Sequence, residues 1–403
     1  MTSTGSIGER IRQLRKERMP TLTQRELAEK AGVSVDLISK LEQGTKQSAL
    51  LVTLHKIAHA LDVDVSAIVS RSVHIDVKGS GRENAGILAV RRAITAIDED
   101  GEPVGEEELG KSATLAWGNY WSNRFDALAG MLPDFITVSR ATVRETGSTA
   151  AYEALSNAYG IAASMLVHLN NIDLGYVAME RAISAAGHTD DELRRAALHG
   201  WLSWILMHHT DSIDTARRLA IREADAIEPR MKDATPEQIS VWGTLLSRAA
   251  TVAAREENAS EADDIINLAE VAAVRLQGMN WSRSLYNQAP FGLPLVIMRT
   301  TEIAVITGRP ERALTVAQRM PPDADMTLAE RARHLADVAF AYTEVGKLRD
   351  AETTLYTIRR LAPKWMLYQS YPRFIVGELW EREKRARSKG LRDLAEWMRV
   401  PLN

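Results

Sequence analysis

The sequence contains no cysteine. Disulfides, thiol nucleophiles and thiolate metal sites are therefore excluded, and the composition fits a reducing compartment. The first residues carry no apolar signal core, and no uninterrupted apolar run approaches the roughly 18 residues that cross a bilayer. We therefore expect a cytoplasmic protein with no membrane-spanning segment.

Catalytic and metal-binding motifs are also lacking. His208 and His209 are adjacent, so their side chains diverge on a helix, and neither an H-E-x-x-H pattern nor a P-loop occurs. An active site would have to be assembled from scattered residues. We therefore expect no enzyme activity, no cofactor and no metal site.

Charge is unevenly distributed along the 403 residues. Residues 1–71 hold eleven lysines and arginines against eight acids, a formal charge of +3, which leaves −6 on the remainder. A mildly basic first segment suits contact with phosphate, although the motif within it must carry that interpretation. The length and the 45% of hydrophobic residues allow two or more cores.

Apolar residues recur at helical spacing throughout, which predicts an all-α chain. The polar stretch Gly79-Ser-Gly-Arg-Glu83 contains two glycines and predicts a hinge, and the acidic stretch from Asp98 to Gly110 predicts an exposed loop. We divide the chain into a first domain over 1–78, a linker and exposed loop over 79–110, and a third part over 111–403.

Beyond Lys111, helical pairs recur at intervals of roughly 40 residues, the range of stacked helical repeats. One segment fits the tetratricopeptide (TPR) pattern well, with its apolar, small and terminal positions at Leu335, Val338, Ala339, Tyr342, Ala351, Leu355 and Pro363. Weaker copies place small or apolar residues at Ala163 and Gly175, Ala216 and Ala220, Ala262 and Ile266, and Ala313 and Ala317. We therefore predict a TPR-like α-solenoid.

The first domain carries the most specific pattern. Ile7, Ile11 and Leu14 form the apolar stripe of a first helix, and Thr23 with Glu26 forms a capping box for a second.

Two small residues then mark a helical turn. Ala28 lies where two helices would cross, Gly32 can adopt the left-handed turn, and Ser34 caps a third helix. The core beneath them is expected from Leu27, Val33, Ile38 and Leu41.

This unit, from Gln24 to Gly44, resembles the Cro/repressor (XRE) DNA-binding domain over about the first 70 residues. The resemblance implies a five-helix domain whose third helix lies in the major groove of double-stranded operator DNA. Gln24 and Lys46 match positions that meet phosphate. The positions expected to face DNA along the third helix are Ser34, Val35, Asp36, Ser39 and Lys40. A proline common before the fourth helix is replaced by Gln47-Ser48-Ala49, a difference that affects the loop.

A helical-repeat body behind such a domain resembles a broad class of regulators, including actinobacterial ones. Trp201, Trp204 and His208 recur at helical spacing and are candidates for an effector site, although packing explains such a stripe equally well. A second candidate stretch combines aromatic, amide and cationic residues at Asn280, Trp281, Arg283, Tyr286 and Asn287; its alternative is a solvated loop between repeats.

Two hypotheses for function follow. In the first, the protein is a homodimeric transcriptional regulator that binds an operator and senses a peptide, a small molecule or another protein. In the second, it is a TPR-type interaction adaptor whose DNA-binding domain is not essential. Salt-dependent, sequence-specific binding to the DNA upstream of its own gene distinguishes the two.

Overall fold

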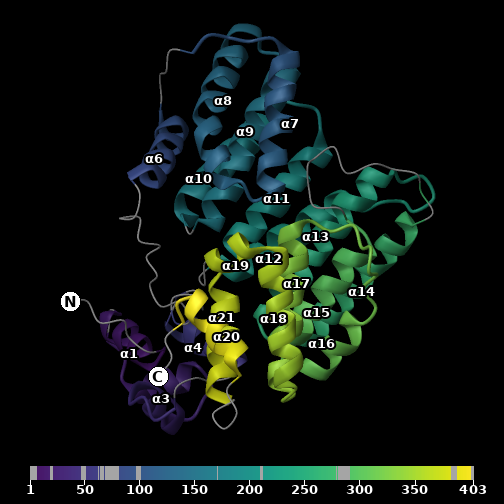
Figure 1. Cartoon of the computed structure of the whole chain (residues 1–403). Helices are drawn as coiled ribbons and strands as arrows, with labels where there is room; N and C mark the ends of the chain where they lie inside the picture. The colour runs from purple at the N-terminus through teal and green to yellow at the C-terminus, as the bar shows by residue number, and fades with distance from the viewer. Residues whose placement is uncertain are drawn as a thin grey trace.

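The computed structural model describes residues 7–18, 21–46, 51–61, 63, 68, 81–96, 101–169, 171–208, 212–277, 279, 291–382 and 388–400. Within these ranges the only regular secondary structure is helical, which confirms the all-α prediction (Figure 1). None of the helices described is long and apolar enough to cross a membrane.

The first four helices form a small bundle, which we call the head (described residues between 7 and 68). They are α1 (Ile7–Glu17), α2 (Gln24–Lys30), α3 (Val35–Glu42) and α4 (Leu51–Leu61). Ile11, Leu27, Ile38, Leu41 and Leu54 are fully buried between them. Only Ile68 is described from the segment where a fifth helix is expected, and it is helical.

The local signals of the head are confirmed. Thr23 and Glu26 form the capping box of α2, with Thr23 Oγ1 accepting from the Glu26 backbone N–H and the Glu26 carboxylate accepting from that of Thr23. Ser34 caps α3 by accepting from the Leu37 N–H at 3.2 Å. Gly32 has a φ of +60°, the left-handed conformation that this turn requires.

The stretch expected to be a hinge is partly helical, so that prediction was wrong for its last residues. Helix α6 spans Gly81–Thr95. Its second half buries Val90, Ala93 and Ile94 in the core shared with α8. Apolar residues at helical spacing thus outweigh the glycine at the start of this helix. Residues 79 and 80 lie outside the described residues.

The acidic stretch from Asp98 to Gly110 is likewise only partly a loop. Helix α7 begins at Glu106, and three acids occupy its first turn, where the helix dipole favours negative charge. Before it, Gly101 lies against Thr137 of α8, and the Val104 backbone N–H donates to Thr142 Oγ1 at 3.0 Å. Gly101 and Val104 therefore pack along α8, whereas Glu102, Pro103 and Gly105 are exposed, as the loop prediction expects.

The remaining chain, with α6, forms the body (described residues 81–400), which is a row of antiparallel helical hairpins. The pairs are α7 (Glu106–Trp121) with α8 (Phe125–Thr146), α9 (Thr149–His168) with α10 (Ile172–Ala186), α11 (Glu192–Leu206) with α12 (Ile213–Ala226), α13 (Pro236–Arg255) with α14 (Ala259–Leu276), α15 (Leu293–Ile306) with α16 (Pro310–Ala317), and α17 (Leu328–Glu344) with α18 (Leu348–Leu361). The chain ends with α19 (Pro363–Tyr368), α20 (Ser370–Arg382) and α21 (Lys389–Trp397).

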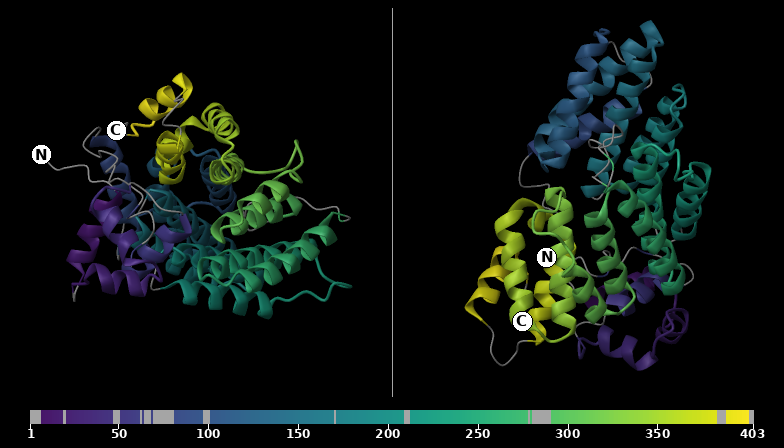
Figure 2. Two further views of the ribbon diagram at one scale, coloured as in Figure 1. Left: turned by 90° about the horizontal axis from the view of Figure 1, so that it is seen from below. Right: turned by 90° about the vertical axis from the view of Figure 1, so that its right-hand side faces the viewer.

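Stacking of these hairpins gives two layers. Each first helix contacts the first helix of the next hairpin, so that α7, α9, α11, α13, α15 and α17 form one continuous layer. The second helices cover it on the other side, and the stack continues from α7 at one end to α17 and α18 at the other (Figures 1 and 2). This is the arrangement expected of a helical-repeat solenoid.

The hairpin predicted from the TPR pattern is present at α17 and α18. Ala339, Ala351 and Leu355 are fully buried between its helices, and Tyr342 packs against the same core. Pro363 begins α19. Among the weaker copies, Gly175 of α10 lies so close to α9 that an added Cβ would be 3.1 Å from the Ala163 carbonyl oxygen.

A buried carboxylate joins three helices of the first layer. Glu302 of α15 accepts from Arg299 Nη1 at 2.7 Å and from Arg333 Nη2 of α17 at 3.0 Å, and Arg255 of α13 lies 3.9 Å away. Burial alone would raise the pKa of Glu302, but the three cations outweigh it and lower the pKa to about 2. The carboxylate therefore stays ionised and holds the three helices together.

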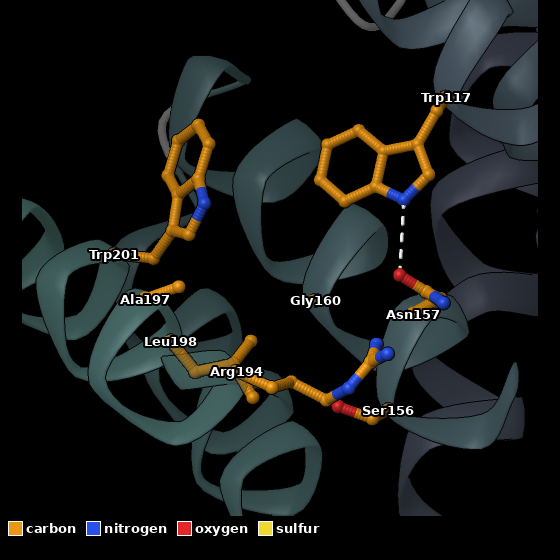
Figure 3. A pocket seen from close by; sticks show the side chains of 8 residues that line it. All are labelled: Trp117, Ser156, Asn157, Gly160, Arg194, Ala197, Leu198 and Trp201. Carbon is orange, nitrogen blue, oxygen red and sulfur yellow. Dashed lines mark hydrogen bonds between the residues drawn. The ribbon is translucent and has the colours of Figure 1, made fainter. Parts of the chain in front are cut away.

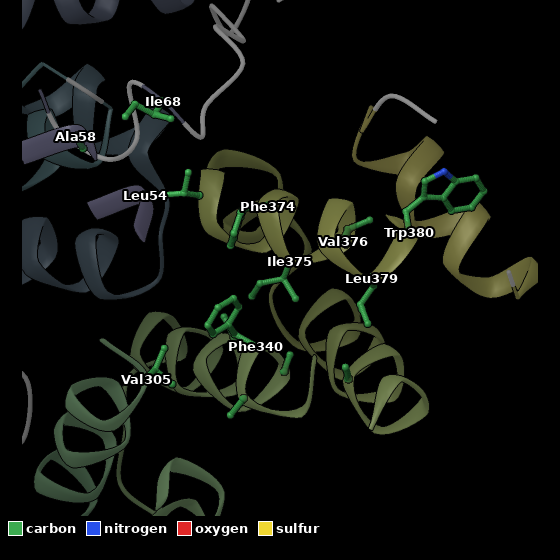
Figure 4. Packing of buried hydrophobic residues seen from close by; sticks show 14 of the residues in the cluster. Leu54, Ala58, Ile68, Val305, Phe340, Phe374, Ile375, Val376, Leu379 and Trp380 are labelled. Atoms are coloured by element: carbon green, nitrogen blue, oxygen red, sulfur yellow. The ribbon is translucent and has the colours of Figure 1, made fainter. Parts of the chain in front are cut away.

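The head packs against the far end of the body, although more than three hundred residues separate them in sequence. Its core is continuous with that of α17, α18, α20 and α21. Figure 4 shows Leu54 of α4 directed at α20, which carries Phe374 and Ile375. A second contact joins Lys56 Nζ to Glu257, 3.3 Å away in the turn between α13 and α14.

The close approach at Gly243 predicts a stability change with a known direction. A Cβ at Gly243 of α13 would lie 2.0 Å from Cζ of the buried Phe291 ring, so Gly243→Ala must displace that ring. We expect a loss of about 1–3 kcal/mol in the free energy of unfolding, measured by chemical denaturation of the full chain.

Gly118→Ala is the matched control. Gly118 lies on the exposed side of α7, with nothing within 4 Å of an added Cβ. There the same substitution should stabilise by up to about 1 kcal/mol, because alanine favours the helix. Equal effects at the two glycines would contradict the packing described at Phe291.

Candidate functional site

Helix α3 presents a polar, accessible face at the surface of the head. Ser34, Val35, Asp36 and Lys40 are exposed, and Val35 has 44% of its surface accessible. Ile38 and Leu41, on the opposite side of the helix, are fully buried. The helix is therefore anchored by one face and free to contact a partner with the other.

Two of these side chains pair with each other. Lys40 Nζ lies 2.7 Å from Asp36 Oδ2 one turn earlier, and both side chains are more than half exposed. Such a pair contributes only about 0.3–0.5 kcal/mol, so a phosphate or a base edge can displace it at little cost. Ser39 Oγ accepts from Gln43 Nε2 at 3.0 Å.

The turn after α3 holds Lys46 near the end of this helix. The Lys40 carbonyl oxygen accepts from the Lys46 backbone N–H at 3.0 Å and from Thr45 Oγ1 at 3.1 Å, and Gly44 has a φ of +72°. Lys46 is exposed. A second cation thus follows the polar face directly.

A buried ion pair beneath α3 was not foreseen from the sequence. Arg15 of α1 donates to both carboxylate oxygens of Glu42, each at 2.7 Å, and donates from Nη1 to the Leu22 carbonyl oxygen. Gln24 Nε2 also donates to Glu42, at 2.8 Å. The pair fixes α1 to the end of α3, and it orients Gln24, the residue expected to meet phosphate.

The charge state of Glu42 follows from these partners. Burial would raise its pKa, but the hydrogen bonds from Arg15 and Gln24 outweigh burial and hold the pKa below its usual value. Because the pKa is lower in the folded chain, the stabilisation is present above the unfolded pKa and is lost as the pH falls.

A second residue that sequence reasoning missed is Gly8. An added Cβ there would lie 1.6 Å from the carbonyl oxygen of Leu41, so only glycine allows α1 to approach α3 this closely. A glycine within the apolar stripe of the first helix is the only sequence signal that pointed to it.

The candidate effector residues Trp201 and Trp204 of α11 and His208, two residues after its end, lie together in an aromatic cluster of the body. Trp201 and Trp204 contact edge to face with ring centroids 5.6 Å apart, and Trp204 contacts His208 at 5.3 Å. Neighbouring helices contribute Trp117, Tyr120, Trp121, Phe125 and His168. The cluster thus joins α7, the start of α8, α9 and α11.

A tyrosine and a histidine at its centre are both neutral. Tyr120 Oη lies 3.2 Å from His168 Nε2. Burial lowers the pKa of His168 to about 4 and raises the pKa of Tyr120. Neither group changes charge near neutral pH, so the pair fixes the rings in place.

A small pocket opens beside this cluster (Figure 3). The two indoles of Trp117 and Trp201 face each other across Gly160, and Trp117 Nε1 donates to Asn157 Oδ1 at 3.1 Å. Arg194 lines the opposite side, where it pairs with Glu153 at 3.2 Å. The remaining lining residues are Ser156, Ala197 and Leu198.

Arg248 of α13 packs on the indole of Trp201. The Arg248 guanidinium is 4.9 Å from the Trp201 ring, and its buried Nε has no hydrogen-bond partner among the described residues. Burial, reinforced by the charge of Arg299, lowers the pKa of Arg248 to about 9. This guanidinium is therefore a cation with unused hydrogen-bonding capacity.

The second candidate stretch cannot be placed. Asn280, Trp281, Arg283, Tyr286 and Asn287 lie outside the described residues. The structure therefore brings together Trp201, Trp204 and His208 only.

Known proteins match the head. A family model described as "Helix-turn-helix" matches residues 11–68. Residues 11–68 therefore form a helix-turn-helix domain. In such domains, a helix in the position of α3 contacts base edges in the major groove.

Two relatives have a similar domain. They are the proteins named HTH-type transcriptional regulator SinR from Bacillus licheniformis and from Bacillus subtilis (strain 168), each 36% identical to this chain over 73 residues. The matched segment covers 18% of this chain and 64% of each relative. The similarity thus concerns the helix-turn-helix domain and not the body.

The buried pair predicts a pH-dependent stability of the helix-turn-helix domain. Glu42→Gln leaves Arg15 buried without its counter-charge, which should cost about 3–5 kcal/mol. In the unchanged chain, the free energy of local unfolding of α1 and α3 should fall as the pH drops below 4.5, the usual pKa of a glutamate. Hydrogen exchange of head peptides in the full chain measures both effects.

Glu17→Gln provides the control, because Glu17 is an exposed carboxylate on the same helix that also accepts from a glutamine. This change should leave exchange nearly unaltered. If Glu42→Gln were equally silent, the pair would not hold α1 and α3 together.

Proposed function

We propose that the chain is a sequence-specific DNA-binding transcriptional regulator. The accessible polar face of α3, held from behind by the Arg15–Glu42 pair, is the observation that carries this proposal. Its support is the helix-turn-helix match and the similarity to two proteins named as transcriptional regulators. Operator DNA is then the partner of the head.

Each residue of this face has a role in the proposal. Lys40 donates to a guanine edge once it leaves Asp36, Asp36 accepts from cytosine, and Val35 contacts a thymine methyl group. Gln24 and Lys46 contact phosphate and set the register. Ser34 and Ser39 lie beside them, Ser34 with its oxygen engaged in capping α3.

Regulation requires two further steps. One helix-turn-helix domain covers only half of an operator, so the body brings two copies together as a homodimer. The body also receives a signal from a peptide, a small molecule or another protein. The aromatic cluster at Trp201, Trp204 and His208 with Arg248 is the surface we propose for it, and an anionic group is the chemistry that Arg248 favours.

Base and phosphate contacts predict different mutant phenotypes. Lys40→Ala should relax specificity at one base position, a loss of about 1–3 kcal/mol there, whereas Gln24→Ala should weaken all sites alike. The measurement selects operator sequences from a random DNA pool with the full chain, then titrates them at several salt concentrations.

Lys16→Ala, which removes the same charge from the exposed side of α1, should preserve specificity. An operator preference unchanged by Lys40→Ala would contradict the assignment of α3. Binding without any sequence preference would instead favour the adaptor hypothesis.

A second test concerns the signal. Arg248→Met should leave operator affinity within about twofold but remove the change in affinity produced by the small-molecule fraction of host-cell extract. Arg359 is a matched control because it also stacks on an indole, 4.6 Å from Trp397, in the outer helix α18.

Arg359→Met should respond like the unchanged chain. A normal response by Arg248→Met would place the signal site elsewhere, and an unchanged chain that ignores every fraction would contradict sensing by this body.

A further inference from the structure

Helix α14 carries an apolar stripe that none of the described residues covers. Leu268, Val271 and Val274 expose 44%, 56% and 53% of their surfaces. They lie on the outer side of the helix, since Ala262, Ile266, Ala269 and Ala273 face the core. No other described helix exposes three large hydrophobic side chains.

Acidic residues along the flanks of this stripe are paired with neighbouring helices. Glu261 accepts from Arg217 of α12 at 2.9 Å, and Asp263 accepts from Arg309 at 2.7 Å. Glu270 pairs with Arg319, which follows α16. The two flanks are thereby tied within the chain.

Two charged residues beside Leu268 and Val271 have no ion-pair partner in the part of the chain that the structure describes. Asp264 and Arg275 are exposed and form no ion pair among the described residues. They lie at opposite ends of a line of four positions, with Leu268 and Val271 between them, and Val274 lies to one side of this line. At about 100° per residue, the four positions fall within about 60° of one another on the helix.

Their spacing is that of a coiled-coil seam. The steps of four, three and four residues from Asp264 through Leu268 and Val271 to Arg275 alternate as the a and d positions of a heptad do, and such positions form the contact line between two helices packed side by side. When a second copy of this helix runs in the opposite direction, Asp264 lies opposite Arg275 and Leu268 lies opposite Val271. The stripe is therefore complementary to itself.

We propose that α14 pairs antiparallel with α14 of a second copy about a two-fold axis between positions 269 and 270. Leu268 then packs on Val271 of the second copy, and Asp264 pairs with Arg275 of the second copy at both ends. This inference rests on the proposed homodimer and identifies its interface.

The position of the head agrees with this pairing. Lys56 of the head contacts Glu257, just before α14 begins. At 1.5 Å per residue, the two Lys56–Glu257 contacts would lie about 40 Å apart along the paired helices, close to the roughly 35 Å between half-sites one DNA turn apart.

Charge reversal tests the proposal. Asp264→Arg and Arg275→Asp, each alone, place like charges opposite each other, so the dimer of the full chain should dissociate at least tenfold more readily in sedimentation velocity. The double change Asp264→Arg with Arg275→Asp restores opposite charges and should return the dissociation constant to within about threefold of the original. Failure of this rescue overturns the antiparallel pairing.

The apolar part of the proposed interface is tested separately, with a matched control. Val271→Asp should abolish the dimer, whereas Val177→Asp, at an exposed valine of the outer helix α10, should leave it intact. Circular dichroism confirms that both variants fold. An unchanged dimer in Val271→Asp would overturn the interface.

Failure of this inference and failure of the proposed function give different results. A dimer that ignores every α14 substitution, but binds an operator with two half-sites, overturns the interface alone. A monomer that still selects a half-site overturns the dimer and with it this inference. Loss of sequence-specific DNA binding by the unchanged chain overturns the proposed function, whatever its oligomeric state.

Discussion

Close approach of helix backbones is the constraint on which both parts of the molecule depend. In the head, Gly8 brings α1 onto the carbonyl of Leu41, which lets Arg15 reach Glu42 at the end of α3. In the body, Gly175 admits α10 to the surface of α9, and Gly243 leaves room for the ring of Phe291. Tight packing requires that a side chain at any of these positions displace its neighbours.

Head and body form one connected unit through two contacts of different character. The apolar contact between α4 and α20 joins the head to the end of the chain, and the Lys56–Glu257 ion pair joins it to the middle of the body. A change in the curvature of the helical stack would alter the distance between these two anchor points. The orientation of the head therefore depends on the shape of the body.

Sequence reasoning succeeded where the cause of the structure is local. The caps at Thr23 and Ser34 and the left-handed turn at Gly32 depend on residues within a few positions of one another, so their patterns could be read directly. The polar stretches were misjudged in part, because tertiary packing on α8 and the helix dipole at Glu106 determine their structure. Arg15 and Glu42 lie too far apart in sequence for their pairing to show.

The candidate effector site in the body shows the same difference between local patterns and long-range contacts. The helical spacing of Trp201, Trp204 and His208 correctly placed them side by side, yet Arg248 comes from another hairpin, and no short pattern links it to Trp201. Similarly, the stripe on α14 can be recognised only after the charged residues of α14 that pair with neighbouring helices are told apart from those that do not. The sequence alone does not show these pairs.

The contact of α4 with α20 also has a consequence for biosynthesis. The ribosome completes α4 more than three hundred residues before it completes α20, an interval on the order of tens of seconds at elongation rates of about 5–20 residues per second. Throughout this time the nascent head can fold on its local contacts while the side of α4 around Leu54 has no cover from the same chain. Translation speed and chaperone access thus act on this surface before the final helices close over it.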